Sequence, residues 1–357
     1  MKGNPLKRLG ICVFSLLLLI ILLNGLMSNG SLIENYYSKG FYPIFSWIPK
    51  ILFGWIPFSF GDICYALLLV LGIYLLLRSI FLLFRKQGKK SIYSFLKLII
   101  LLLGIYAYFH ISWGLNYYRI SISKQLELKT DTVLLEDHLA VLSNHIQLVN
   151  ALREKLDFNS FERKETEKRI ERLMKNDKDF PMLSKTQVQI KHPFSNTLAS
   201  YFGVSGYFNP LTHEAHINGK MPLASYPFTL AHELSHQMGI GFEDECNFIA
   251  YVKLHQQQDT WFAYSAYYES VSYLLRSLYL VDPVLFKQYR AQLSPKVLGD
   301  FKSDQEFWKN YTGWIADISG LFYDQYLKHN NQAEGMARYG MVSRLIIAYE
   351  KNKRPLE

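Results

Sequence analysis

Three long apolar runs in the first third of the chain constrain its fold more than any other feature. They cover residues 9–27, 61–84 and 92–115 of the 357-residue sequence. About 20 consecutive apolar residues are enough to cross the hydrocarbon core of a bilayer as a helix. The first run has the basic start of a signal peptide, but it is long and no A-x-A cleavage site follows it cleanly. We therefore predict about three transmembrane helices, the first of them retained.

The segment between the first two runs, residues 41–60, has a different character. It is aromatic and is interrupted by Pro43, Pro49 and Pro57. Because proline breaks a helix interior, we predict an interfacial or re-entrant segment, with a fourth short span as the alternative. These features together predict a membrane domain over residues 1–118 and a second domain over residues 119–357.

Basic residues predict how the chain crosses the membrane. Lysine and arginine cluster in residues 2–8 and again in residues 85–90, whereas the loop between the first two runs carries only Lys39 and Lys50. Positive charge favours the cytoplasmic side, so we expect a cytoplasmic N-terminus and an extracytoplasmic second domain. The net charge of +9 is thereby explained by topology, and we expect membrane lipids rather than nucleic acid as partners. The oligomeric state is not predicted.

The second domain has the pattern of an α+β fold that is mostly helical. Residues 131–156 show helical apolar spacing, and the charged stretch that follows is typical of a solvated helix. The sequence "TQVQIKH" alternates as a strand does, and so does "EAHIN" at Glu214–Asn218. A helix follows in "YPFTLAHELSHQMG", with Pro227 suited to its first turn and Gly239 to its C-terminal cap.

The helix "YPFTLAHELSHQMG" contains the motif HExxH. His232 and His236 are four residues apart, so both imidazoles project from one face, and Glu233 lies beside the first. Two neutral histidines are typical zinc ligands, and the glutamate can take a proton from an activated water. The alternative is an amphipathic helix with two polar surface histidines.

A third protein ligand for zinc is expected a few residues later. Glu243 begins "EDECN" and shares a helix face with Asn247, which resembles the ExxxD element of glutamate-type zincins. That resemblance implies Glu243 as ligand and Asn247 as a neighbour that orients a ligand histidine. Glu245 is the alternative ligand. In zincins an edge strand that pairs with extended substrate precedes the site, and "EAHIN" with His216 occupies this place in the sequence.

Motifs spread over most of the chain resemble one bacterial inner-membrane family, catalogued as a domain of unknown function (number 3810). The family name implies a bacterial membrane location but brings no substrate. The motifs are "IPFSFGDICY", "WGLNYYR", "YFGVSGYF", "FTLAHELSHQMGIGFEDECNFIAY" and "YDQYLKHNNQAEGMARYGMVSRLI". More loosely, "EDECN" followed by Ala250 is similar to the ExEADxxA element of membrane metallopeptidases, from which Cys246 and Asn247 depart.

These resemblances imply a zincin-like, membrane-anchored metallopeptidase that hydrolyses extracytoplasmic polypeptides. Zn²⁺ is the expected cofactor and Glu233 the expected general base. Further candidates for transition-state or substrate contacts are His216, Tyr264, Tyr267, Tyr268, Arg338 and Tyr339. For each tyrosine, core packing is the alternative. The alternative function is a non-catalytic envelope scaffold or binding protein with a structural or vestigial zinc site.

Overall fold

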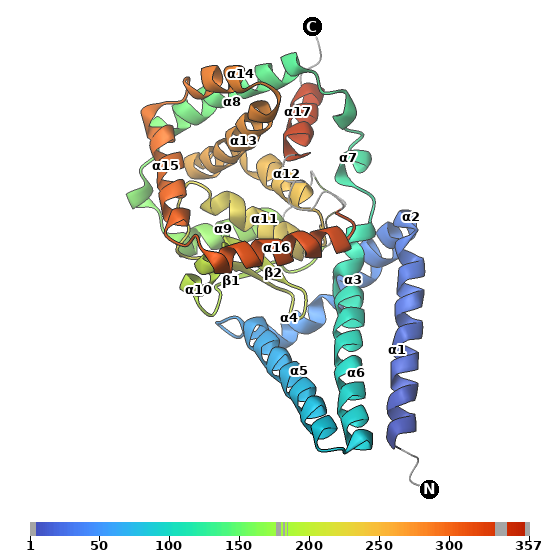
Figure 1. Cartoon of the computed structure of the whole chain (residues 1–357). Coiled ribbons are helices and arrows are strands. Elements are labelled where there is room, and N and C mark those ends of the chain that lie inside the picture. The colour runs from blue at the N-terminus through green and yellow to red at the C-terminus, as the bar shows by residue number, and fades with distance from the viewer. Residues whose placement is uncertain (1–4, 176–179, 181–182, 184, 333–340, 354–357) are drawn as a thin grey trace. The chain divides into compact units, whose positions relative to one another are not determined.

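The computed structural model of the chain describes residues 5–175, 180, 183, 185–332 and 341–353, and these residues are mostly helical (Figure 1). They divide into two compact units. The first, here called the membrane unit, comprises the chain up to Arg119 together with Asn209–His213. The second, here called the large unit, comprises Ile120–Phe208 and the chain from Glu214 onward.

The membrane unit contains the three helices that the apolar runs predict. These are α1 (Pro5–Met27), α5 (Phe60–Phe84) and α6 (Gly88–Ser112), and each is long and apolar enough to cross a membrane. Helix α6 packs against both α1 and α5. Few of their apolar side chains are buried within the protein, which is the arrangement that a lipid surrounding favours.

Short helices occupy the chain between α1 and α5. They are α2 (Gly30–Leu32), a π-helix (Ile33–Phe41), α3 (Tyr42–Phe45) and α4 (Trp47–Phe53). They follow one another directly, with Ser46 as the one turn residue between them, and Ile51 and Trp55 expose their side chains. The interfacial segment and the fourth short span therefore both stay predictions for residues 41–60.

A buried ion pair connects the chain after α1 to the chain after α6. Arg119 donates to both carboxylate oxygens of Glu34, over 2.8 and 2.7 Å, and follows a 3₁₀ turn at Gly114–Tyr118. In that turn Asn116 accepts a hydrogen bond of 2.8 Å from Ser38. Bidentate arginine–carboxylate pairs have a restricted geometry, so this pair fixes how the two segments meet.

The large unit surrounds one central helix, α11 (Tyr226–Gln237). It packs against α9, α12, α13 and strand β3, and nearly all of its residues are buried. The other helices of the unit are α7 (Ile122–Gln125), α8 (Leu135–Glu154), α9 (Arg163–Lys175), α10 (Asn196–Tyr201), α12 (Glu243–Leu254), α13 (Thr260–Val281), α14 (Pro283–Arg290), α15 (Pro295–Lys309), α16 (Trp314–His329) and α17 (Val342–Lys353), with 3₁₀ turns at Thr130–Thr132 and Phe158–Ser160.

A small three-stranded sheet lies beside α11. Its strands are β1 (Ile190–Lys191), β2 (Gly206–Asn209) and β3 (Glu214–Ile217), in the order β1-β3-β2. The predicted strand at Glu214–Asn218 therefore exists, but the prediction that it lies at an edge was wrong. Strand β3 pairs in parallel with β1 and has β2 on its other side, so its backbone groups already have partners and the edges of the sheet are β1 and β2.

Candidate metal centre

Helix α11 begins and ends as its sequence predicts. Pro227 lies in the first turn, where its missing N–H has no helical partner to lose. After the last helical residue, Gly239 takes φ +87°, a left-handed conformation that glycine adopts without steric cost. The chain then turns within Gly239–Phe242 and enters α12 at Glu243. This short turn brings the start of α12 against the histidines of α11.

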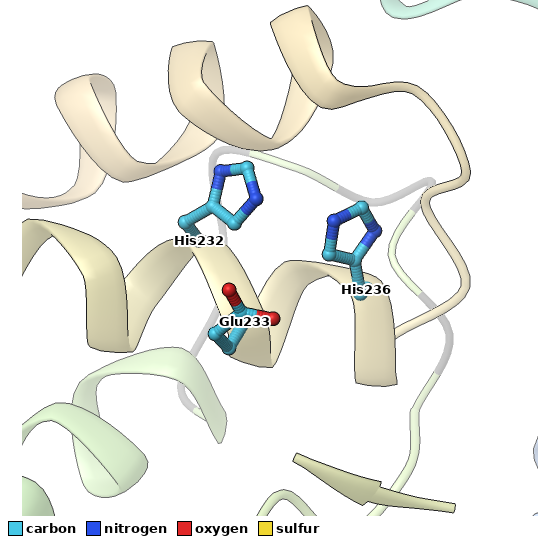
Figure 2. Close-up of side chains that lie close together, drawn as sticks. All are labelled: His232, Glu233 and His236. Atoms are coloured by element: carbon cyan, nitrogen blue, oxygen red, sulfur yellow. The ribbon is translucent and has the colours of Figure 1, made fainter. Parts of the chain in front are cut away.

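Figure 2 shows His232 and His236 projecting from the same side of α11, with Glu233 between them on the helix. The three side chains are buried, and each offers a ligand atom within 4.8 Å of the others. Glu243 lies closer still to the two histidines. Its carboxylate oxygens are 3.1 Å from Nε2 of His232 and 3.3 Å from Nε2 of His236, so two imidazoles and one carboxylate converge on one point.

The other ring nitrogen of each histidine faces a hydrogen-bond acceptor. Nδ1 of His232 donates to Oδ1 of Asn247 over 2.7 Å, and Nδ1 of His236 donates to the carbonyl of Ile240 over 2.8 Å. Such bonds orient a ligand imidazole and decide which nitrogen carries the proton. In a neutral ring, the Nε2 atom then carries a lone pair toward the Glu243 carboxylate. In a protonated ring, the form that the contacts with Cys246 and Glu243 favour for His236 by raising its pKa, Nε2 donates to that carboxylate.

Cys246 and Glu245 follow Glu243 on α12 and make different contacts. Cys246 lies 3.3 Å from Nδ1 of His236, and burial raises the pKa of its thiol to about 12. Glu245, the alternative ligand in the sequence, accepts a hydrogen bond of 2.7 Å from the backbone N–H of Ile122 instead. The geometry therefore brings Glu243 rather than Glu245 to the histidines.

Glu233 is buried beside the convergent groups and contacts the edge strand. Burial, with the Glu243 carboxylate nearby, raises the pKa of Glu233 to about 7 against the opposing effect of the two histidines. A Cβ atom on Gly206 in β2 would lie only 2.6 Å from Cγ and 2.7 Å from Oε1 of Glu233. Position 206 must therefore be glycine for Glu233 to hold its present position.

One further contact comes from a distant part of the chain. The hydroxyl of Tyr323, on α16, donates a hydrogen bond of 2.7 Å to Oε1 of Glu243. Sequence reasoning missed both Tyr323 and Gly206. The only signal for them was that they lie in the quoted motifs "YDQYLKHNN" and "YFGVSGYF", which name positions without assigning them a partner.

The remaining candidates lie elsewhere or outside the described residues. Tyr264 and Tyr268 donate to carboxylates on α15, Asp300 and Asp304, and Tyr267 packs on the His145 ring; these contacts are those of helix packing. His216 stacks on Tyr207, with ring centroids 4.4 Å apart. Arg338 and Tyr339 lie outside the residues that the structure describes.

Comparison with known proteins gives a family and no activity. No curated protein and no solved structure matches the chain. One family model, described as "Protein of unknown function (DUF3810)", matches residues 37–347. The match includes most of both units but not α1, and it contains the HExxH helix, Glu243 and Tyr323. Because it covers most of the sequence, the chain belongs to the DUF3810 family.

Proposed function

We propose that this protein is a membrane-anchored zinc metallopeptidase that hydrolyses peptide bonds of extracytoplasmic polypeptides. The observation that carries the proposal is the convergence of Nε2 of His232, Nε2 of His236 and the Glu243 carboxylate, at 3.1 and 3.3 Å, beside Glu233. Two histidines and a glutamate are the ligand set of one class of catalytic zinc sites.

The three convergent side chains fit a bound cation. Separations of 3.1 and 3.3 Å between the ring nitrogens and the carboxylate require positive charge between them, which either a ring proton or a bound cation supplies. Ligands held tetrahedrally about 2.0–2.1 Å from zinc lie about 3.3 Å from one another, which agrees with the observed separations. The hydrogen bonds from Nδ1 to Asn247 and Ile240 keep the Nε2 atoms available as ligands.

The positions of the metal site, Glu233 and Tyr323 suggest a separate role for each in the proposed hydrolysis. When bound, the metal supplies Lewis acidity and makes a water molecule acidic enough to act as a nucleophile near neutral pH. Glu233 is placed to accept the proton from the attacking water and to transfer it to the leaving amine nitrogen. Tyr323 holds Glu243 through its hydroxyl, which restricts the carboxylate to the orientation that faces the histidines.

An extended substrate is expected along β2 rather than along β3. Strand β2 is at the edge of the sheet, and its residue Gly206 touches Glu233. An edge strand offers backbone N–H and C=O groups to an added strand. A substrate chain paired with β2 would therefore pass next to the proposed general base.

The proposed location combines the three apolar helices with the distribution of charge. Helices α1, α5 and α6 support a membrane-associated protein. The basic clusters at residues 2–8 and 85–90 support a cytoplasmic N-terminus in the bacterial inner membrane. With three spans, the large unit is then extracytoplasmic.

Metal analysis and peptide hydrolysis, measured on the purified wild type and on Glu233→Gln, test the proposal. Glutamine keeps the shape of the side chain and removes its basicity. We expect about one zinc per chain in both proteins and a loss of hydrolysis of roughly 10²–10⁴-fold in the variant. Equal behaviour of the two proteins, combined with unfolding of His236→Ala, would instead support a scaffold with a structural metal.

A further inference from the structure

Helix α16 presents two unlike faces. One face carries Tyr323, which bonds to Glu243, and Leu327, the helix's one buried residue. The other face is apolar and exposed: the exposed fractions are 72% for Trp314, 68% for Leu321 and 74% for Phe322. A helix attached to the candidate site by one face thus leaves an apolar surface uncovered on the other.

Helix α10 also exposes apolar side chains, and it lies near the start of α16. Phe194, just before the helix, is 73% exposed, and Leu198 is 54% exposed. The ring of Tyr201 in α10 contacts that of Tyr311, just before α16, with centroids 5.1 Å apart. This contact joins α10 to the start of α16, and we call the exposed apolar side chains of the two helices together the apolar rim.

The apolar rim is connected to the candidate site from two directions. After α10, only Phe202–Ser205 separate the helix from β2, whose Gly206 touches Glu233. From the other side, α16 reaches Glu243 through Tyr323. A polypeptide that pairs with β2 beside Glu233 would therefore have the rim next to its side chains.

The charge of the two helices distinguishes a polypeptide from a lipid surface. Membrane-surface helices usually carry several lysines and arginines on their polar face. The structure describes α10 and α16 in full, and over both helices Lys328 is the only lysine or arginine, paired with Asp324. Lys328 offsets Asp324, so Asp317 leaves the two helices without the net positive charge that attracts an anionic lipid surface. Exposed apolar patches also mark contacts with other polypeptides.

We propose that the apolar rim binds apolar side chains of the polypeptide to be cleaved, so that the substrates are chains that expose apolar segments, as unfolded polypeptides do. This inference rests on the proposed function in one respect, namely that the bound polypeptide is a substrate. The binding itself does not require hydrolysis, which allows the two proposals to fail separately.

The test uses the full chain in lipid nanodiscs, as Glu233→Gln so that no peptide is consumed. The probes are a short fluorescein-labelled peptide in which Leu alternates with Gln, and a matched peptide with Ser in place of each Leu. Fluorescence anisotropy measures Kd. We expect the Leu peptide to bind at least about tenfold more tightly than the Ser peptide.

Substitutions then locate the binding. Leu321→Ser with Phe322→Ser should weaken binding of the Leu peptide by about tenfold or more. Both side chains are exposed, so the fold should persist, and an unchanged Tm verifies this. The matched control is Leu280→Ser with Val281→Ser, two exposed apolar residues at the end of α13, which should leave Kd unchanged.

Three results would overturn the inference: equal Kd values for the two peptides, an unchanged Kd in the α16 variant, or an equal loss in the control.

Amide hydrogen exchange of residues 314–329 distinguishes a bound polypeptide from bound lipid. Protection that appears only with the Leu peptide supports a polypeptide, whereas protection already present in nanodiscs and unchanged by peptide identifies lipid as the occupant. Peptide binding at the rim without any hydrolysis by wild type would refute the proposed function and leave the docking surface standing.

Discussion

Gly206 lies so close to Glu233 that a single added carbon would collide with the glutamate side chain. A Cβ at position 206 would be 2.6 Å from Cγ of Glu233, well inside the 3.5–4.0 Å at which carbon atoms attract one another. The strand that borders the candidate site and the residue proposed as its base are therefore fitted to each other.

The first prediction follows from this contact. Gly206→Ala should displace Glu233 and lower peptide hydrolysis by a factor approaching that of Glu233→Gln, while zinc content stays near that of wild type. Hydrolysis assays with metal analysis on the same preparations measure both. Gly299→Ala is the matched control, because a Cβ at position 299 meets open space. Wild-type turnover in Gly206→Ala would show that the position of Glu233 does not matter to the chemistry.

The second prediction concerns the hydrogen bond from Tyr323 to Glu243. Tyr323→Phe removes only the hydroxyl, and loss of a group that orients a metal ligand typically costs 10–100-fold in metal affinity or activity. Competition with a zinc chelator should therefore show weaker binding in this variant. Tyr279→Phe, at an exposed position on α13, should bind zinc as wild type does. If both variants hold zinc equally, Tyr323 does not position the ligand.

The third prediction separates the two carboxylates of α12. Glu243→Ala should lose most of the zinc, because its oxygens are those that face both histidines. Glu245→Ala should retain zinc but lower the free energy of unfolding by about 1–3 kcal/mol, since it leaves the buried N–H of Ile122 without its acceptor. Zinc retained in Glu243→Ala and lost in Glu245→Ala would reverse the ligand assignment.

The fourth prediction concerns pH and a pair that supports α11. His192 Nε2 lies 3.2 Å from Glu167, which also accepts a hydrogen bond of 2.6 Å from Tyr226. The contact with Glu167 raises the pKa of His192. Burial opposes ionisation of Glu167, but its bonds to His192 and Tyr226 bring its pKa below the usual value.

These directions determine the pH window. The contribution of His192 to folding stability is fully present below about pH 6.5, the pKa of histidine in the unfolded chain, and it is lost as pH rises through the raised pKa of the folded state. The contribution of Glu167 runs the other way: it is present above about pH 4.5 and is lost as pH falls through the lowered pKa of the folded state. His192→Gln should therefore reduce the free energy of unfolding most between about pH 5 and 6.5, by about 0.2–1 kcal/mol for a partly exposed pair, and less at pH 8. Denaturant titrations at both pH values measure this; an equal loss at each would contradict it.

The fifth prediction concerns topology. The test uses a reporter enzyme that works only outside the cytoplasm. Fused after Glu357, it should show activity, because the basic clusters flank the cytoplasmic ends of the spans. The same reporter fused within residues 85–90 should be silent. The opposite pattern would invert the proposed orientation.

Much of the architecture could be predicted from local pattern. The apolar runs at 9–27, 61–84 and 92–115 correspond to α1, α5 and α6, because a span depends on composition and length alone. The ends of α11 at Pro227 and Gly239 were also predictable, since the conformational preferences of these residues are local. The four-residue spacing of His232 and His236 placed both rings on one helix face.

Tertiary structure decided what sequence spacing left open. Glu243 and Glu245 both begin the same helix, and only the turn at Gly239–Phe242 and the N–H of Ile122 separate their roles. Strand β3 alternates as an edge strand could, yet it lies between β1 and β2, because strand order depends on pairing between distant segments. Gly206 and Tyr323 reach the site from positions about 30 and 80 residues away, and contacts at such separations arise from packing, which local propensity does not encode.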